Sequence, residues 1–378
     1  MLALTIWRPS AATAQAGAKV QPLYHVAVSA QTGVVGLTPA QVRRAYGFDQ
    51  IENQGAGQTI GIVAAFDYPD IERDLAVFDQ AFGLPPCTTK NRCFQKVDMS
   101  GGRMDPNGVW PPEIALDVEW AHAIARQAKI LLVEAADDTL DSLLAAVDTA
   151  VRNGATVVSM SWGAAEFSTE MVDEDGHFVG RNVTFFAASG DRGHGVIYPS
   201  ASPYVMSVGG TTLHVSNDGS YGNEKAWDGS GGGLSSYEPE PVYQASYPIP
   251  NNPQLKRGTP DVAYDGDPNT GVAVYNSVPL AGWFQLGGTS IGPPQWSALV
   301  AIANSMRHAA RKPPLTGSQG VLYDAANIAY AANYHDVNNG NNGKCDELCK
   351  TGKAYDYVTG LGTPRADSLI LALKDLPR

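Results

Sequence analysis

"KILLVEAADDTLDSLLAAVDTAVRNGATVVSMSWG", residues 129–163, decides the fold class of this chain. Its first eight residues form an apolar run that is typical of a buried strand, and residues 155–163 form a second such run. Between them, residues 140–154 repeat apolar side chains at helical spacing and end at a glycine. This order predicts two parallel strands joined by a helix that covers one face of their sheet.

The same alternation continues on both sides of this stretch. Apolar runs predict further strands, and amphipathic patterns predict helices, the first of them entered through Thr38-Pro39. The region 211–285 is rich in Gly, Tyr and Pro and predicts hairpins and loops, after which a strongly apolar helix begins. Without an internal repeat or a long linker, one α/β domain with a mostly parallel central sheet flanked by helices is expected. The expected strands are 58–66 and 182–191, and the expected helices are 37–48, 70–83 and 113–128.

Composition limits the classes of function. The 378 residues are 44% hydrophobic, enough for a large core, and contain 26 Lys and Arg against 38 Asp and Glu. The net charge of −12 disfavours nucleic-acid binding, and no run of eighteen apolar residues predicts a membrane span. Only 17% of residues are charged, and such a surface suits a secreted protein that avoids strong self-repulsion in acid.

The N-terminus gives a weak indication of export. Residues 1–18, MLALTIWRPSAATAQAGA, contain a short apolar stretch and end in small residues, but they lack a basic start and are interrupted by Arg8-Pro9. We expect residues 1–36 to be an N-terminal segment, the remnant of an export signal or a propeptide. The folded domain is expected to span residues 37–378.

Four cysteines occur as two close pairs, Cys87 with Cys93 and Cys345 with Cys349. Each pair can close a small disulfide loop in an oxidising compartment, or all four can bind zinc. The spacings fit no standard zinc pattern and no histidine lies close by in the sequence, which favours two disulfides.

Two carboxylates, Glu113 and Asp117, are four residues apart on a predicted helix and therefore lie on one face of it. One interpretation is a solvated acidic face. The neighbouring positions Leu116, Val118 and Trp120 are apolar, however, and no Lys or Arg is nearby in the sequence. A buried pair would share a proton and can act as a general base in acid, where a histidine would be protonated.

Two turns carry further candidates. Asp191 follows a predicted strand in FFAASGD, where a carboxyl can cap the turn or, when protonated, donate a hydrogen bond to an oxyanion. Ser290 lies in QLGGTSIGPPQW, residues 285–296, between two glycines and two prolines. It is either a nucleophile on a tight turn or an ordinary loop serine.

Together these motifs resemble the sedolisins, or serine-carboxyl peptidases (peptidase family S53), from about Leu37 to Pro364. The ExxxD helix, the SGD turn and the GTS turn occur in the family's order. The resemblance implies a subtilisin-like three-layer fold and a secreted, acid-active serine-type endopeptidase with a Ser-Glu-Asp triad. It implies that Ser290 is the nucleophile and that Glu113 is its base. Asp117 would orient Glu113, and Asp191 would bind the oxyanion.

The resemblance also implies one calcium ion in the C-terminal segment 334–364. The matching residues supply carboxylates from Asp336 and Asp356 and backbone carbonyls from Val337, Gly352 and Ala354. Without the resemblance, this stretch would be interpreted as an Asn- and Gly-rich loop held by the second cysteine pair.

Two stretches resemble substrate-binding segments. Residues 159–163 would run along an extended peptide through Ser161, Trp162 and Gly163, with the Trp162 ring lining the site. Residues 229–239 would form the opposite wall at Gly232, or only a structural glycine loop. The expected partners are peptide or protein substrates, without nucleic acid or membrane, and we expect a monomer.

Other classes fit the sequence less well. A histidine-based subtilisin would need a His-Gly-Thr motif, which the chain lacks, and His122 has no glycine after it. An esterase matches G-x-S-x-G at Ser290 but would need a later histidine, and only His308 and His335 follow. A catalytically silent, secreted peptide-binding relative would have lost a catalytic residue, and none is lost. Pro293 stands where many sedolisins carry a small residue, which leaves the conformation of the turn open.

Overall fold

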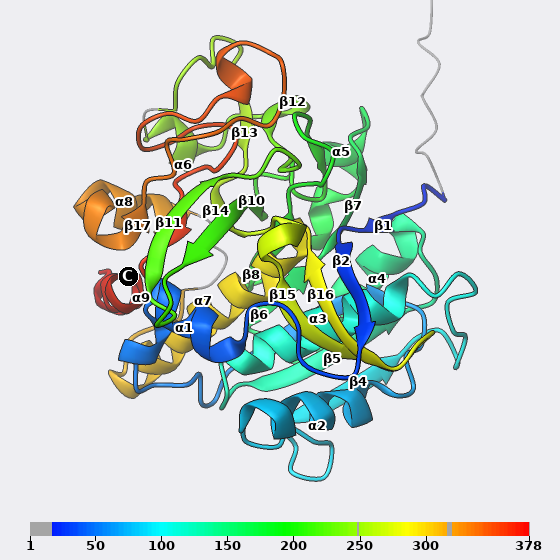
Figure 1. The fold of residues 1–378 in the computed structure, drawn as a ribbon. Coiled ribbons are helices and arrows are strands. Elements are labelled where there is room, and N and C mark those ends of the chain that lie inside the picture. Colours follow the sequence, from blue (N-terminus) through cyan, green and yellow to red (C-terminus); the bar gives the residue numbers. More distant parts are fainter. Residues whose placement is uncertain (1–16, 248, 316–319, 378) are drawn as a thin grey trace, which may run out of the picture.

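The computed structural model describes residues 17–247, 249–315 and 320–377 and contains one large central sheet (Figure 1). One strand pair at its edge is antiparallel and the other pairs are parallel. The strand order is β11 (Tyr221–Ala226), β10 (Met206–Val215), β8 (Thr184–Ala188), β6 (Val157–Met160), β3 (Thr59–Ala65), β5 (Lys129–Ala135) and β4 (Phe94–Asp98), with β14 (Val262–Asp265) also on β10. In β3, β5, β6 and β8 nearly every residue is buried, so both faces of the sheet are covered. The α/β fold with a mostly parallel sheet is therefore confirmed.

Helices pack on this sheet and on one another. Those in contact with the central strands include α3, α4 and α7, and α3 also packs against α7. The helix α3 is buried along its whole length, which explains why its sequence lacks a polar stripe. The α-helices of the described chain are α1 (Pro39–Tyr46), α2 (Ile71–Phe82), α3 (Trp110–Ile124), α4 (Leu140–Arg152), α5 (Glu170–Asp173), α6 (Val242–Ala245), α7 (Gly292–Ala309), α8 (Gly320–Asn333) and α9 (Ala366–Asp375).

Local sequence signals account for several helix ends. Thr38 caps α1 by accepting a hydrogen bond from the Gln41 N–H, and the Gln41 side chain bonds back to the Thr38 N–H, as the Thr38-Pro39 pair predicts. Pro293 and Pro294 lie in the first turn of α7, where a backbone N–H has no partner within the helix. Pro293 is thus compatible with a regular helix start immediately after Ser290.

Two strands form within residues 17–36, where the sequence pattern predicts none. The short β1 (Gln21–Pro22) pairs with β7 (Trp162–Ala165), and β2 (His25–Gln31) pairs with β16 (Gly282–Gly287). Figure 1 shows β2 in blue beside the yellow β16. The export signal predicted in residues 1–18 lies almost wholly outside the described residues, and the domain boundary at residue 37 stays a prediction.

Smaller sheets complete the fold. The first contains β1, β7 and β9 (Ile197–Tyr198), and another contains β2, β16 and β15 (Val272–Asn276). Two further pairs are β12 (Gly233–Pro239) with β13 (Lys256–Thr259), and β17 (Tyr334–His335) with β18 (Thr363–Pro364). Among the described residues, no helix has the length and apolar character required to span a membrane.

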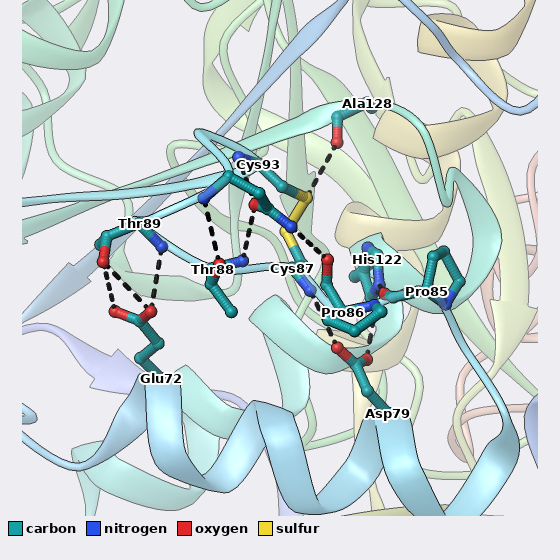
Figure 2. The surroundings of a disulfide bond; sticks show 11 residues. Glu72, Asp79, Pro85, Pro86, Cys87, Thr88, Thr89, Cys93, His122 and Ala128 are labelled. Atoms are coloured by element: carbon teal, nitrogen blue, oxygen red, sulfur yellow. Dashed lines mark hydrogen bonds and ion pairs between the residues drawn. A yellow bond between two sulfur atoms is a disulfide. The ribbon is translucent and has the colours of Figure 1, made fainter.

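Both cysteine pairs are joined as disulfides, Cys87 to Cys93 and Cys345 to Cys349, so their sulfurs are not available as zinc ligands. Figure 2 shows the first disulfide above α2, whose Asp79 carboxylate accepts a hydrogen bond from the Cys87 N–H. The buried His122 ring lies beside it, with Nε2 2.8 Å from the Pro85 carbonyl oxygen. Burial lowers the pKa of His122 to about 4. His122 therefore belongs to the packing of this loop and not to the surroundings of Ser290.

Candidate active site

Ser290 lies on the tight connection between β16 and α7. Gly288 precedes it with φ 112° and ψ 162°, a conformation essentially restricted to glycine. A single 3-10 turn, Thr289–Ile291, then leads into α7. The chain must therefore turn sharply at Gly288, and this turn places the Ser290 hydroxyl beside α3.

Glu113, in the first turn of α3, is the partner of Ser290. The Ser290 Oγ donates a hydrogen bond to Glu113 Oε2 at 2.8 Å, and both side chains are fully buried. One helical turn further on, Asp117 Oδ1 accepts a hydrogen bond of 2.6 Å from the Ser161 hydroxyl. The helical spacing thus brings both carboxyls and Ser290 into one buried cluster.

Burial controls the protonation of this carboxyl pair. It raises the pKa of Glu113 well above 4.5, and the nearby Asp117 carboxylate raises it further. Burial also raises the pKa of Asp117. No Lys or Arg of the described residues forms an ion pair with either group. The pair therefore holds a proton to a higher pH than an exposed carboxyl would.

Asp191 comes from the turn after β8 and is tied to the Ser290 turn. Its Oδ1 accepts hydrogen bonds from the Thr289 backbone N–H at 2.8 Å and from the Thr289 hydroxyl at 2.7 Å. The Gly190 N–H in turn donates to the same hydroxyl at 3.2 Å. Thr289 thereby fixes the two turns to each other, a role that the sequence pattern did not reveal.

Of the residues expected to bind substrate, some lie beside Ser290 and one points into the core. Ser161 and Gly163 line the strand edge beside Ser290, and the Ser161 carbonyl oxygen faces that hydroxyl at 3.2 Å. The Trp162 ring does not line the site, because it is buried in the core and its Nε1 donates to the Val63 carbonyl oxygen. The expectation for this ring was wrong, since alternate residues of a strand face opposite sides.

Gly231, and not Gly232, faces the cleft next to Asp191. The cleft has a volume of about 310 Å³, and Gly231 is one of its lining residues. Gly232 forms a pair of backbone hydrogen bonds with Gly195, and a Cβ at this position would lie 2.0 Å from the Tyr357 carbonyl oxygen. Gly232 is therefore needed because the backbones of Tyr357 and Gly195 pack closely against it, and it does not line the cleft.

The residues proposed for calcium come together at the C-terminal loops. The Tyr330 hydroxyl lies 3.1 Å from Asp336 Oδ1 and 3.0 Å from the Ala354 carbonyl oxygen. The Gly352 N–H donates to Asp356 Oδ2 at 3.0 Å. The Thr359 hydroxyl links Asp356 to the Val337 carbonyl oxygen, which completes the set of Asp336, Val337, Gly352, Ala354 and Asp356. Asp356 is 4% exposed and has no ion pair with a Lys or Arg among the described residues, so a buried carboxylate here lacks a counter-charge.

Comparison with known proteins places the site in context. The model of the subtilase family (Peptidase_S8) matches residues 105–344. The chain is 34% identical over 367 residues to kumamolisin from Bacillus sp. strain MN-32, covering 89% of this chain and 63% of kumamolisin. It is 27% identical over 343 residues to sedolisin from Pseudomonas sp. strain 101, covering 82% of this chain and 56% of sedolisin. The chain thus spans less than two thirds of the length of these curated relatives.

A solved structure agrees with this comparison. Pseudomonas sedolisin, a serine-carboxyl proteinase complexed with two molecules of pseudo-iodotyrostatin, superposes with a TM-score of 0.74 at 27% identity. The match covers 90% of this chain and 98% of that one. The described fold is therefore the fold of that proteinase over nearly its whole length.

Proposed function

Because the chain belongs to the sedolisin branch of the subtilase family, we propose that it is a secreted, acid-active serine-type endopeptidase. One observation carries the proposal: the buried Ser290 hydroxyl donates to Glu113 Oε2 at 2.8 Å. A hydroxyl is a weak nucleophile until a base removes its proton, and this contact supplies the base. The retention of Asp117 and Asp191 supports an active enzyme rather than a silent peptide-binding relative.

The proposed reaction is acyl transfer. Ser290 Oγ attacks the carbonyl carbon of a peptide while Glu113 accepts its proton, and Glu113 then gives that proton to the leaving amine. Water hydrolyses the Ser290 ester by the same steps in reverse. The Ser290 backbone N–H and a protonated Asp191 carboxyl stabilise the oxyanion. Asp117 keeps Glu113 in place and shares its proton.

Acid dependence follows from the two carboxyl sites. Asp191 can donate to an oxyanion only when it carries a proton, so we expect activity to fall as pH rises. Glu113 accepts a proton only while the Glu113–Asp117 pair is not fully protonated, which limits activity at the lowest pH. We therefore expect a bell-shaped pH profile with its maximum in acid.

The test is cleavage of a denatured protein between pH 3 and 8 by three variants. Ser290→Ala should lose at least about 10⁴-fold in kcat. Asp191→Asn should lose about 10² to 10³-fold in kcat, and its remaining activity should persist to higher pH because an amide donates at any pH. Asp49→Asn, an exposed site, serves as the control and should leave the profile unchanged. If Ser290→Ala cleaved the protein as fast as the unmodified enzyme, Ser290 would not be the nucleophile.

We also propose one calcium ion held by the carboxylates of Asp336 and Asp356 and the carbonyls of Val337, Gly352 and Ala354. Calcium prefers mixed carboxylate and carbonyl oxygens, and the convergence of these two loops supports such a site. The ion would supply the positive charge that the buried Asp356 lacks and would stabilise the loops.

We also propose where the protein acts and on what. Two disulfides and a low content of charged residues support export. We propose that the protein acts on peptides or proteins as a monomer. We propose no nucleic-acid or membrane partner.

A further inference from the structure

Ser161 connects β6 to β7, and its side chain points to the carboxyl pair rather than into the cleft. The residue is fully buried and does not line the cleft of about 310 Å³ beside Asp191. Its hydroxyl donates to Asp117 Oδ1 at 2.6 Å and lies 3.3 Å from the Ser290 carbonyl oxygen. A hydroxyl has one proton to donate, and a carboxylate is a stronger acceptor than a carbonyl. Asp117 therefore takes this hydrogen bond.

The backbone of Ser161 faces the nucleophile. Its carbonyl oxygen lies 3.2 Å from Ser290 Oγ, which donates to Glu113 Oε2 at 2.8 Å. The carbonyl and the side chain of this one residue thus contact the two ends of the series Ser290, Glu113 and Asp117. The position of Ser161 therefore affects the whole series.

One oxygen of each carboxyl in the pair lacks a donor. Glu113 Oε1 and Asp117 Oδ2 are buried and have no hydrogen-bond partner among the described residues. The two side chains lie one helical turn apart, and a single proton held between these oxygens would satisfy both. The other oxygen of each carboxyl accepts from a serine hydroxyl, Ser290 for Glu113 and Ser161 for Asp117. The two serines thus have equivalent positions on either side of one shared proton.

The hydrogen bond from Ser161 stabilises the ionised form of Asp117. Burial raises the pKa of Asp117, and this bond opposes the rise. Without the bond, Asp117 would take up a proton at a higher pH, and the pair would then be fully protonated. A fully protonated pair has no oxygen that can accept the Ser290 proton. The bond therefore extends the pH range in which Glu113 can act as a base toward acid.

Two other titratable groups act on Glu113. Asp191, from the turn after β8, raises the pKa of Glu113 through its negative charge. Tyr24 lies close enough for the Glu113 charge to raise the pKa of its hydroxyl. The causes of the Asp117 pKa shift, by contrast, are burial and the Ser161 hydroxyl. Ser161 thus acts on the member of the pair that lies farther from Ser290 in the hydrogen-bonded series.

The helix α3 packs against α1, α2, α7, β3, β5 and β15. Strand β3 carries no titratable side chain, and Arg307 of α7 donates to the carbonyl oxygens of Leu373 and Leu376. Among the described residues, no ion pair or hydrogen bond joins the carboxyl pair to the other titratable side chains of these helices and strands, which are Arg43, Arg44 and Tyr46 of α1, Glu72, Arg73, Asp74 and Asp79 of α2, Glu119 and His122 of α3, Lys129 and Glu134 of β5, Tyr275 of β15 and His308 of α7. The proton balance of the pair therefore depends on burial, on Asp191 and on the neighbouring hydroxyl and N–H donors.

We propose that Ser161 is a positioning residue of this active site, whose hydroxyl keeps the Glu113–Asp117 pair at one proton in acid, so that Glu113 can still accept the proton of Ser290. The proposal rests on the function proposed above. A peptide on the strand edge would contact only the backbone of Ser161, which every residue at this position provides. The side chain should therefore affect kcat and not KM.

The first experiment compares pH profiles of kcat and KM for a fluorogenic peptide taken from a site that the unmodified enzyme cuts in denatured protein. Ser161→Ala should move the acid limb of kcat upward by about one to two pH units, the effect of losing a hydrogen bond to a charged group. The alkaline limb should stay in place, because Asp191 is bonded to Thr289 and not to Ser161. KM should change less than about twofold. An acid limb that does not move, or equal losses of kcat on both limbs, would overturn the proposal.

Matched variants separate the hydroxyl from the stability of the fold. Ser161→Thr keeps a hydroxyl and should keep the acid limb in place, and a limb that moves as far as that of Ser161→Ala would overturn the proposal. Ser207→Ala is the control, because Ser207 on β10 is also fully buried but its hydroxyl has no hydrogen-bond partner among the described residues. It should change neither limb. Thermal midpoints of all variants are measured over the same pH range.

Ser161→Cys provides a second reading if Ser161→Ala does not fold in acid. A thiol is close in size to a hydroxyl and is a weak donor, so the acid limb should move in the same direction by a smaller amount. A Ser161→Cys limb at the position of the unmodified enzyme would also overturn the proposal.

Asp117→Asn tests whether Ser161 acts through Asp117. If it does, adding Ser161→Ala to Asp117→Asn should change kcat less than about twofold at each pH, because the two substitutions remove the same interaction. A further loss of about tenfold in the double variant would overturn the proposal. Cleavage by the unmodified enzyme with an unmoved acid limb in Ser161→Ala would reject the role of Ser161 and leave the peptidase standing. Failure of the unmodified protein to cleave any denatured protein would reject both.

Discussion

Gly288 shows how strictly a single residue is determined at this site. Its φ and ψ angles are essentially accessible only to glycine. The space that a Cβ would take is already occupied by the Leu23 carbonyl oxygen and the Asp191 carboxyl. The two glycines before Ser290 in the sequence predict a tight turn, but the sequence does not indicate what approaches that turn. Thr289 illustrates the same limit, because its hydrogen bonds with Asp191 and Gly190 depend on a turn that is distant in the sequence.

We predict that Gly288→Ala abolishes most activity. The added methyl group would displace the Asp191 carboxyl, so kcat should fall at least about 100-fold, the effect of losing an oxyanion donor. Gly57→Ala is the matched control, because Gly57 also has a positive φ, 79°, but has no atom within 4 Å of the position that a Cβ would take. Gly57→Ala should lower the thermal midpoint by a few degrees and keep kcat. Comparable kcat losses in the two variants would show that general backbone strain is responsible.

At the scale of elements, helical periodicity explains why the carboxyl pair could be predicted. Residues four apart on α3 lie one turn apart whatever surrounds the helix, so Glu113 and Asp117 are neighbours by local geometry alone. Their burial required the apolar neighbours on all sides, which the sequence also displays. The sequence did not predict β1 and β2. A two-residue strand and a strand without a clear apolar pattern form only where the edge of a partner strand is available.

We predict that calcium bound at the C-terminal loops raises the thermal midpoint. Removing calcium with a chelator should lower the thermal midpoint, because an ion present at 100 times its Kd stabilises the folded state by about 2.7 kcal/mol. Asp356→Ala should produce a similar decrease and make the midpoint insensitive to chelator. Asp346→Ala, an exposed carboxylate in the adjacent disulfide loop, should respond to chelator as the unmodified protein does. A midpoint of the unmodified protein that does not change in excess chelator would contradict the site.

At the scale of the whole molecule, burial raises the pKa of several carboxyls that lie away from Ser290. Burial raises the pKa of Glu238 from 4.5 to about 8, and that of Glu170 to about 9. It raises the pKa of both Asp79 and Glu134 to about 7. All four side chains are nearly inaccessible to solvent, and neither oxygen of Glu238 has a hydrogen-bond partner among the described groups.

These shifts predict lower stability at neutral pH. Between about pH 4.5 and pH 8 the unfolded chain releases the Glu238 proton and the folded chain retains it, so the free energy of unfolding falls as pH rises. One such group contributes a slope of about 1.4 kcal/mol per pH unit. Glu238→Gln should flatten the dependence of the thermal midpoint on pH, and Glu52→Gln, an exposed control, should not. A midpoint that rises from pH 4.5 to pH 8 would contradict the role of these carboxyls.

The sequence by itself determined the α/β fold, the helix that carries Glu113 and Asp117, and the turns of Asp191 and Ser290. These features depend on local periodicity and on backbone conformations, which nearby residues control. Only the tertiary structure decided that the Trp162 ring packs in the core, that Thr289 joins the two turns and that Leu23 lies at the Ser290 N–H. Each of these contacts links segments far apart in the chain, the last across more than 260 residues, and so it forms only when the sheet brings the segments together.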